Sequence, residues 1–147
     1  MLDEFLKFLR PDGGLITLTA IPKGRGLVTE TFDLSSPMGI ADAVEWAEAW
    51  NADRYNIYYQ LQLLKRAFSG RGVRPKEEDV KAVPFVHLDY DWKDEEGNRI
   101  AATPEMIAAK AEEFRAWKLP SALIVSGNGL QVLYRLQIPV STILQDI

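Results

Sequence analysis

Two β-prone runs joined by a glycine-containing turn constrain the fold more than any other feature of this sequence. The runs Ala122–Val125 and Leu130–Leu136 flank Ser126–Gly129, which contains an Asn-Gly step. Such a step between two β-prone runs predicts a β-hairpin, because Asn and Gly tolerate the positive φ angles of a tight turn. A second pair, Leu15–Ile21 and Leu27–Phe32, surrounds a Pro-Lys-Gly-Arg-Gly turn and predicts another antiparallel hairpin.

Helices are expected outside these hairpins. Residues 2–9 have the apolar spacing of a helix. Ser36-Pro37 and Thr103-Pro104 each place a capping residue before a proline, which is typical of a helix start, and we expect helices from there to about Trp50 and Trp117. The chain shows no regular βαβ alternation. We therefore predict an α+β fold, a mainly antiparallel sheet with helices packed on one face.

Composition bounds the function classes. The 147 residues suit one domain covering 1–147, and the net charge of −4 argues against a broadly basic nucleic-acid coat. Disulfides and thiolate zinc sites are excluded by the absence of cysteine, and multi-histidine metal sites by the single His87. No apolar stretch approaches the ~20 residues of a membrane span, and the start of the chain lacks a basic signal-peptide region. We expect a cytoplasmic protein with no membrane partner.

The strand expected from Lys81 to Leu88, which leads to two aspartates, carries the clearest chemistry. Side chains alternate along a strand, so Asp89 and Asp91 share one face with Cα atoms roughly 7 Å apart. Paired carboxylates suit hard divalent cations, which are often recruited to handle phosphates. The alternative is an acidic strand end that merely leads into the solvated turn Asp94–Glu96.

His87 is expected on the aspartate face, where it would hydrogen-bond a ligating carboxylate or serve as a structural histidine. Tyr90 and Trp92 are expected to point away from the aspartates and to pack.

The tip of the C-terminal hairpin is a candidate phosphate site. A glycine-rich tip exposes backbone N–H groups, and Ser126 and Gln131 flank it with neutral hydrogen-bonding groups. The alternative is that the glycines serve the turn alone.

Residues 60–79 are expected to form a flexible loop, or a short helix built on Leu61, Leu64 and Phe68, and the part from Lys65 to Lys76 is strongly basic for an acidic protein. The positive charges would hold a template backbone or an incoming triphosphate, or they belong to a solvated mobile loop. They are Lys65, Arg66, Arg71, Arg74 and Lys76.

These features follow one another in a recognisable order. An Asn-Ile-Tyr-Tyr run precedes the basic segment, then come Leu-Asp-Tyr-Asp at 88–91, a helix, and Ile-Val-Ser-Gly-Asn-Gly-Leu-Gln-Val-Leu-Tyr at 124–134. This layout, over about residues 15–138, resembles the primase-polymerase domain of the archaeo-eukaryotic primase superfamily, in the form found in plasmid and phage replication proteins. The resemblance implies an RRM-like core. It also implies primer synthesis or template-directed extension with Mg²⁺ or Mn²⁺.

The resemblance implies roles at matching positions. Asp89 and Asp91 match the metal-binding catalytic aspartates, and Ser126 matches the serine that contacts the nucleotide phosphates. Further nucleotide-binding candidates are Gly127, Asn128, Gly129 and Gln131, the last standing where the family often has histidine, and the basic residues Lys65, Arg66, Arg71 and Arg74. The implied partners are a nucleoside triphosphate, a single-stranded DNA template, and a helicase or other replication protein.

One departure concerns a third motif, an aspartate after a hydrophobic residue. Beyond the second hairpin only Gln137–Ile147 remain, where Asp146 follows a glutamine. We expect the chain to be the N-terminal part of such a domain or a shortened relative of it, and in either case its activity alone is left open. The alternatives are a non-catalytic module that binds nucleotide or nucleic acid through the same fold, and a two-metal nuclease.

Overall fold

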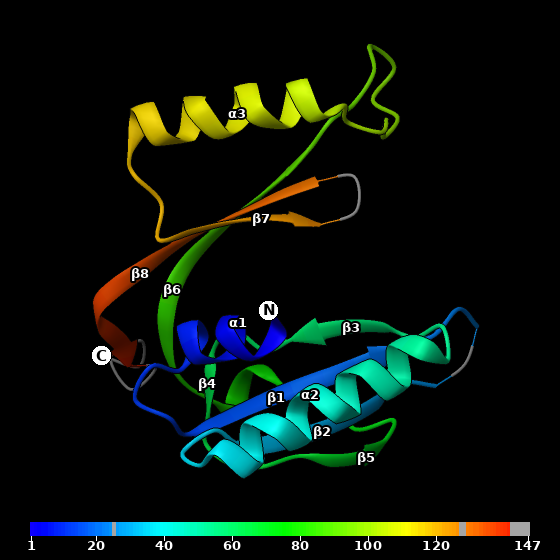
Figure 1. The fold of residues 1–147 in the computed structure, drawn as a ribbon, viewed down its shortest axis with the longest axis vertical. Coiled ribbons are helices and arrows are strands. Elements are labelled where there is room, and N and C mark those ends of the chain that lie inside the picture. Colours follow the sequence, from blue (N-terminus) through cyan, green and yellow to red (C-terminus); the bar gives the residue numbers. More distant parts are fainter. Residues whose placement is uncertain (25, 127–128, 142–147) are drawn as a thin grey trace. The chain divides into compact units, whose positions relative to one another are not determined.

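A computed structural model describes residues 1–24, 26–126 and 129–141 of the chain (Figure 1). Its contacts divide the chain into two compact units, Met1–Val83 with Val140 and Ser141, and Pro84–Pro139. We call them the first and the second unit. The strand pairs whose register is described are all antiparallel, which confirms the α+β fold with mainly antiparallel pairing.

The first unit contains a four-stranded sheet with strand order β3-β1-β2-β5, and α2 lies across it (Figure 1). The hairpin expected between residues 15 and 32 is present, because β1 pairs antiparallel with β2 from Leu15↔Asp33 to Ala20↔Val28. The elements are α1 (Leu2–Leu9), β1 (Leu15–Ile21), β2 (Val28–Asp33), α2 (Pro37–Ala52), β3 (Asn56–Tyr59), β4 (Leu63–Leu64), β5 (Ser69–Arg71) and the 3₁₀ turn η1 (Glu77–Asp79).

The expectation of a flexible loop or short helix at 60–79 is wrong in its secondary structure. The segment contains β4 and β5, and both Leu61 and Phe68 are buried. Its start is held by the guanidinium of the buried Arg10, which donates hydrogen bonds to the carbonyl oxygens of residues 60, 61 and 62. Phe68 donates its N–H to the Thr31 hydroxyl, and β5 then pairs with β2. These partners are remote in sequence, so local propensity did not indicate them.

The second sheet has strand order β4-β6-β8-β7. β6 (Val80–Asp91) begins in the first unit, where it pairs with β4, and its later part lies in the second unit with α3 (Pro104–Trp117), β7 (Ala122–Ser126) and β8 (Gly129–Ser141). The expected C-terminal hairpin is confirmed by the register from Ala122↔Leu133 to Ser126↔Gly129.

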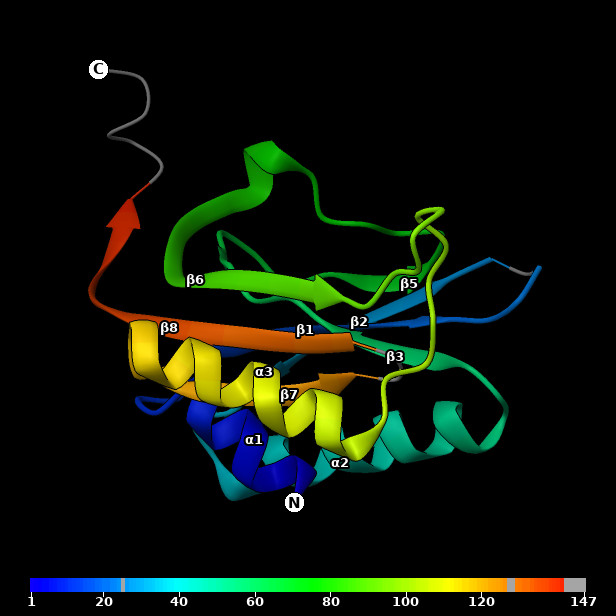
Figure 2. The same cartoon turned by 90° about the horizontal axis from the view of Figure 1, so that it is seen from above.

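The helix α3 covers one face of the second unit's strands and runs alongside β7 and β8 (Figure 2). Its start is the expected one, because the Thr103 hydroxyl accepts the N–H of Met106. Leu130, Val132 and Tyr134 alternate along β8 and pack against side chains of this helix, including Ile107 and Phe114. The opposite face of β7 and β8 is therefore the one not occupied by α3.

Candidate functional site

The two aspartates of β6 share a face with His87, as the alternation predicts. His87 Nε2 lies 3.8 Å from Asp89 Oδ2, with both side chains about half exposed. Tyr90 points the other way, into the cluster beneath α3, where its ring meets those of Trp92 and Phe114. The packing roles expected of Tyr90 and Trp92 are thus confirmed.

The hairpin contributes a matching face. Ser126 pairs with Gly129, and Ile124 with Gln131, so Ser126, Gly129 and Gln131 share one side of the ladder. Their neighbours Leu130 and Val132 occupy the α3 side. Ser126 and Gln131 therefore lie on the face opposite the helix.

Asp91 is brought directly against this hairpin. A Cβ built onto Gly129 would lie 2.6 Å from Asp91 Oδ1, 3.0 Å from the Tyr90 carbonyl oxygen and 3.6 Å from Ser126 Oγ. The direction of that Cβ marks the side of the sheet, so the Asp91 carboxylate occupies the same face as Ser126. The site also requires a residue without a side chain at position 129.

The face continues along both strands towards their other ends. The guanidinium of Arg135, on the same side of β8 as Gln131, lies 4.7 Å from the ring centre of Phe85. Phe85 is two residues before His87 and four before Asp89, so this pair extends the candidate face. Arg135 adds a positive charge to it.

Arg99 is the closest cation to the paired carboxylates. Its Nη2 lies 3.1 Å from Asp91 Oδ2, with 74% of the arginine side chain exposed and 34% of the aspartate's. An ion pair this open to solvent contributes about 0–1 kcal/mol, since water screens it and ordering the side chains costs entropy. The pair therefore leaves the Asp91 carboxylate available to a stronger ligand.

Asp94 organises the turn that carries Arg99. Its carboxylate accepts the N–H groups of Glu96 and Asn98. The hydrogen bond from the Asn98 backbone is the largest cause that holds the pKa of Asp94 below its ordinary value of 3.8. The turn thus keeps its shape at neutral pH, where this carboxylate is charged.

The donor set fits a divalent cation in part. Asp89 and Asp91 offer carboxylate oxygens on one exposed face, as Mg²⁺ and Mn²⁺ prefer. Within residues 1–24, 26–126 and 129–141, no group of three or more His, Cys, Asp or Glu side chains is arranged to hold a metal. Two carboxylates suffice where substrate phosphates and water supply the remaining ligands.

The basic candidates belong to the first unit, and three of them have partners there. Arg66 pairs with Asp79 at 3.5 Å and lies over the Phe68 ring, while Lys65 donates to the Glu78 carbonyl oxygen. The guanidinium of Arg71 lies 5.8 Å from the Trp50 ring centre. Arg74 is in the same unit. Of the hairpin tip, Gly127 and Asn128 lie outside the described residues.

Sequence reasoning missed Arg99 and Arg135. Arg135 could have been predicted from the sequence, since it lies an even number of positions from Gly129 and Gln131 and its side chain therefore shares their face of the strand. Arg99 closes a turn in which Lys93 pairs with Arg99 across an isolated bridge, and this turn returns the chain to the end of β6. The acidic residues Asp94–Glu96 indicated only a solvated turn, so the return of the chain to β6 was not predicted.

No family model matches the chain, and no match was found among curated proteins or solved structures. In the part of the chain that the structure describes, no helix combines the length and the apolar character needed to cross a bilayer.

Proposed function

We propose that this chain is a primase-polymerase-type nucleotidyltransferase domain that acts on single-stranded DNA in plasmid or phage replication. The observation that carries the proposal is the contact of Asp91 with Gly129, because it joins the acidic strand to the serine-bearing hairpin. A metal-bound triphosphate requires carboxylates for the cation, and neutral hydrogen-bond donors and accessible backbone N–H groups for the phosphates.

In this proposal Asp89 and Asp91 hold Mg²⁺ or Mn²⁺. A bound divalent cation would stabilise the attacking and leaving oxygens during transfer of the α-phosphate to a hydroxyl. The Ser126 hydroxyl would donate a hydrogen bond to a phosphate oxygen. The side-chain amide of Gln131 would donate another on the same face. Gly129 permits the close approach of strand β6.

The remaining roles concern the DNA template, the Asp89 carboxylate and the protein partner. The basic residues of the first unit, Lys65, Arg66, Arg71 and Arg74, would neutralise charge on the template backbone. His87 positions the Asp89 carboxylate, next to which it lies. A helicase or another replication protein would be the macromolecular partner.

The test is primer synthesis on single-stranded DNA with labelled nucleotides and Mn²⁺. A full-length version should extend or initiate primers, and its double variant Asp89→Asn, Asp91→Asn should lose that activity by at least about 100-fold, the scale of removing a charge-stabilising group. The matched control is Glu95→Gln, Glu96→Gln, which removes the same charge from the exposed adjacent turn. Equal activity of the aspartate variant and the wild type would refute the proposal.

A non-catalytic binding module is the second candidate. It is favoured by the absence, among the described residues, of a third acidic side chain grouped with the pair. Titration with a nucleoside triphosphate and Mn²⁺ discriminates the two functions. Asp91-dependent binding with no primer synthesis supports the module and rejects the enzyme.

A further inference from the structure

Each carboxylate oxygen of Asp91 lies next to another part of the second unit. Oδ1 lies against Gly129, as the 2.6 Å distance to a Cβ built there demonstrates, and Oδ2 lies 3.1 Å from Arg99 Nη2. The arginine therefore lies at the second oxygen of a carboxylate whose first oxygen lies against the hairpin.

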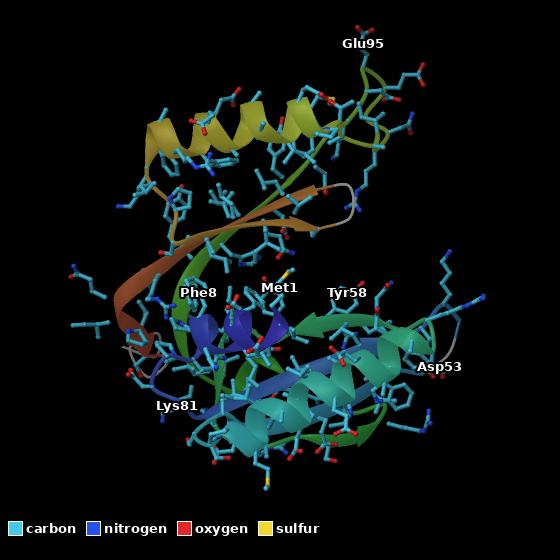
Figure 3. The ribbon with its side chains drawn as sticks, viewed as in Figure 1. Met1, Phe8, Asp53, Tyr58, Lys81 and Glu95 are labelled. Carbon is cyan, nitrogen blue, oxygen red and sulfur yellow. The ribbon has the colours of Figure 1, made fainter. Side chains whose placement is uncertain are left out.

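The backbone that carries Arg99 is well held. Asp94 accepts hydrogen bonds from Glu96 and Asn98, and Ile100 donates its N–H to the Trp92 carbonyl oxygen beside the Lys93↔Arg99 bridge. Glu95 marks the outer end of this turn (Figure 3). The Arg99 side chain is 74% exposed, so its guanidinium can leave Asp91 while the turn stays in place.

A divalent cation and a guanidinium compete for one carboxylate. They repel each other at contact distance, and the exposed ion pair that must break is worth only about 0–1 kcal/mol. Once released, the guanidinium remains tethered near the bound cation. Its planar fork of donors suits the phosphate oxygens that accompany such a cation.

We propose that Arg99 is an exchangeable counter-ion: it neutralises Asp91 until a divalent cation arrives, and it then binds the phosphates of the cation-bound triphosphate. This inference rests on the proposed function and assigns a residue for specificity towards polyphosphates. It makes cation binding without phosphate weaker and cation–triphosphate binding stronger.

The experiment measures two affinities for each variant. Mn²⁺ alone is titrated and followed by the electron paramagnetic resonance of the free ion. A non-hydrolysable nucleoside triphosphate is titrated calorimetrically at saturating Mn²⁺. Arg99→Ala should tighten Mn²⁺ binding by about 2–5-fold, which corresponds to an exposed ion pair. It should weaken triphosphate binding by about 10–100-fold, which corresponds to a lost charged hydrogen bond.

Two further variants separate charge from geometry. Arg115→Ala removes a half-exposed arginine that pairs with Glu112 on α3. It should leave both constants within about twofold of the wild type, because the charge lies on the element that covers the other face. Arg99→Lys should keep Mn²⁺ binding near the wild-type value and still weaken the triphosphate, because an ammonium lacks the bidentate fork.

The inference predicts that Arg99→Ala changes the two affinities in opposite directions, tighter for Mn²⁺ and weaker for the triphosphate. Unchanged constants for Arg99→Ala overturn the inference, and so does a parallel loss of both, which would make Arg99 a mere support of the turn. Asp89→Asn, Asp91→Asn separates the two proposals. If it binds Mn²⁺ like the wild type, the proposed cation site and this inference both fall. If it loses Mn²⁺ while Arg99→Ala changes nothing, only the role of Arg99 falls.

Discussion

At the scale of single residues, the missing side chain of Gly129 sets the geometry of the candidate site. The backbone of Tyr90 and the carboxylate of Asp91 both fill the space that a Cβ would take. The carboxylate could rotate away, but the carbonyl oxygen is part of strand β6 and can move only with the strand. The glycine is thus explained by close approach rather than by an unusual backbone angle.

Gly129→Ala should therefore damage the site and the fold together. We expect a loss of about 1–3 kcal/mol in the free energy of unfolding, the cost of overpacking a tight contact. Displacement of the Asp91 carboxylate should also weaken Mn²⁺ binding. Denaturant unfolding followed by circular dichroism and the Mn²⁺ titration measure the two effects.

The matched control is Gly26→Ala, because nothing lies within 4 Å of a Cβ built there. It should change the unfolding free energy by less than about 0.5 kcal/mol. A Gly129→Ala variant as stable and as competent for Mn²⁺ as the Gly26→Ala variant would show that β6 and β8 are further apart than described.

At the scale of elements, α2 shows how a helix start is set by both local and remote groups. The Ser36 hydroxyl accepts the N–H of Gly39, and Pro37 occupies the first helical position, as the sequence predicts. Gly39 is a poor helix former, yet a Cβ there would overlap the Asp33 carbonyl oxygen at the end of β2. The glycine allows the helix to begin directly against the strand.

Gly39→Ala should destabilise the protein although alanine favours helix. The gain in helix propensity is about 1 kcal/mol, and the collision with a backbone oxygen should exceed it and leave a net loss of about 2 kcal/mol. Denaturant unfolding measures the difference. Asp42→Ala, at an exposed position of α2, should stay within about 0.5 kcal/mol of the wild type. A stabilised Gly39→Ala would contradict the close packing of α2 on β2.

The sequence predicted the elements and site residues that depend on local patterns, and it missed those that depend on remote partners. Thr103 and the two hairpins were recognisable because N-caps and tight turns depend on residues only a few positions apart. The shared face of Asp89 and Asp91 followed from strand alternation alone. Arg99 was not recognised, because its partner is chosen by the path of a turn. The strands β4 and β5 were missed since their pairing partners lie elsewhere in the chain.

At the scale of the whole molecule, contacts divide the chain into two units, each with its own apolar cluster. Ala20, Val28 and Tyr55 form the buried part of a cluster in the first unit, and Trp92 and Leu130 belong to one in the second. Separate clusters favour partly independent opening, because each unit loses its own buried area when it opens. The single-domain expectation stays a prediction.

Paired core substitutions test this division. Leu18→Ala in β1 and Leu130→Ala in β8 remove the same atoms from positions 2% and 1% exposed, and each should cost about 2–5 kcal/mol. Leu130→Ala should reduce the hydrogen-exchange protection of β7 and α3 more than that of β1 and β2, and Leu18→Ala should do the reverse. Equal losses throughout the chain for both variants would instead indicate a single cooperative unit.

The sequence by itself determined the helix starts at Ser36 and Thr103, both hairpins, and the common face of the two aspartates. Each of these depends on alternation, caps or turns, which act over a few residues. Only the tertiary structure decided that Asp91 meets Gly129, 38 positions later, and that Arg99 turns back to its carboxylate. Strand pairing and side-chain packing make such contacts, and their free energy comes from partners that no local pattern specifies.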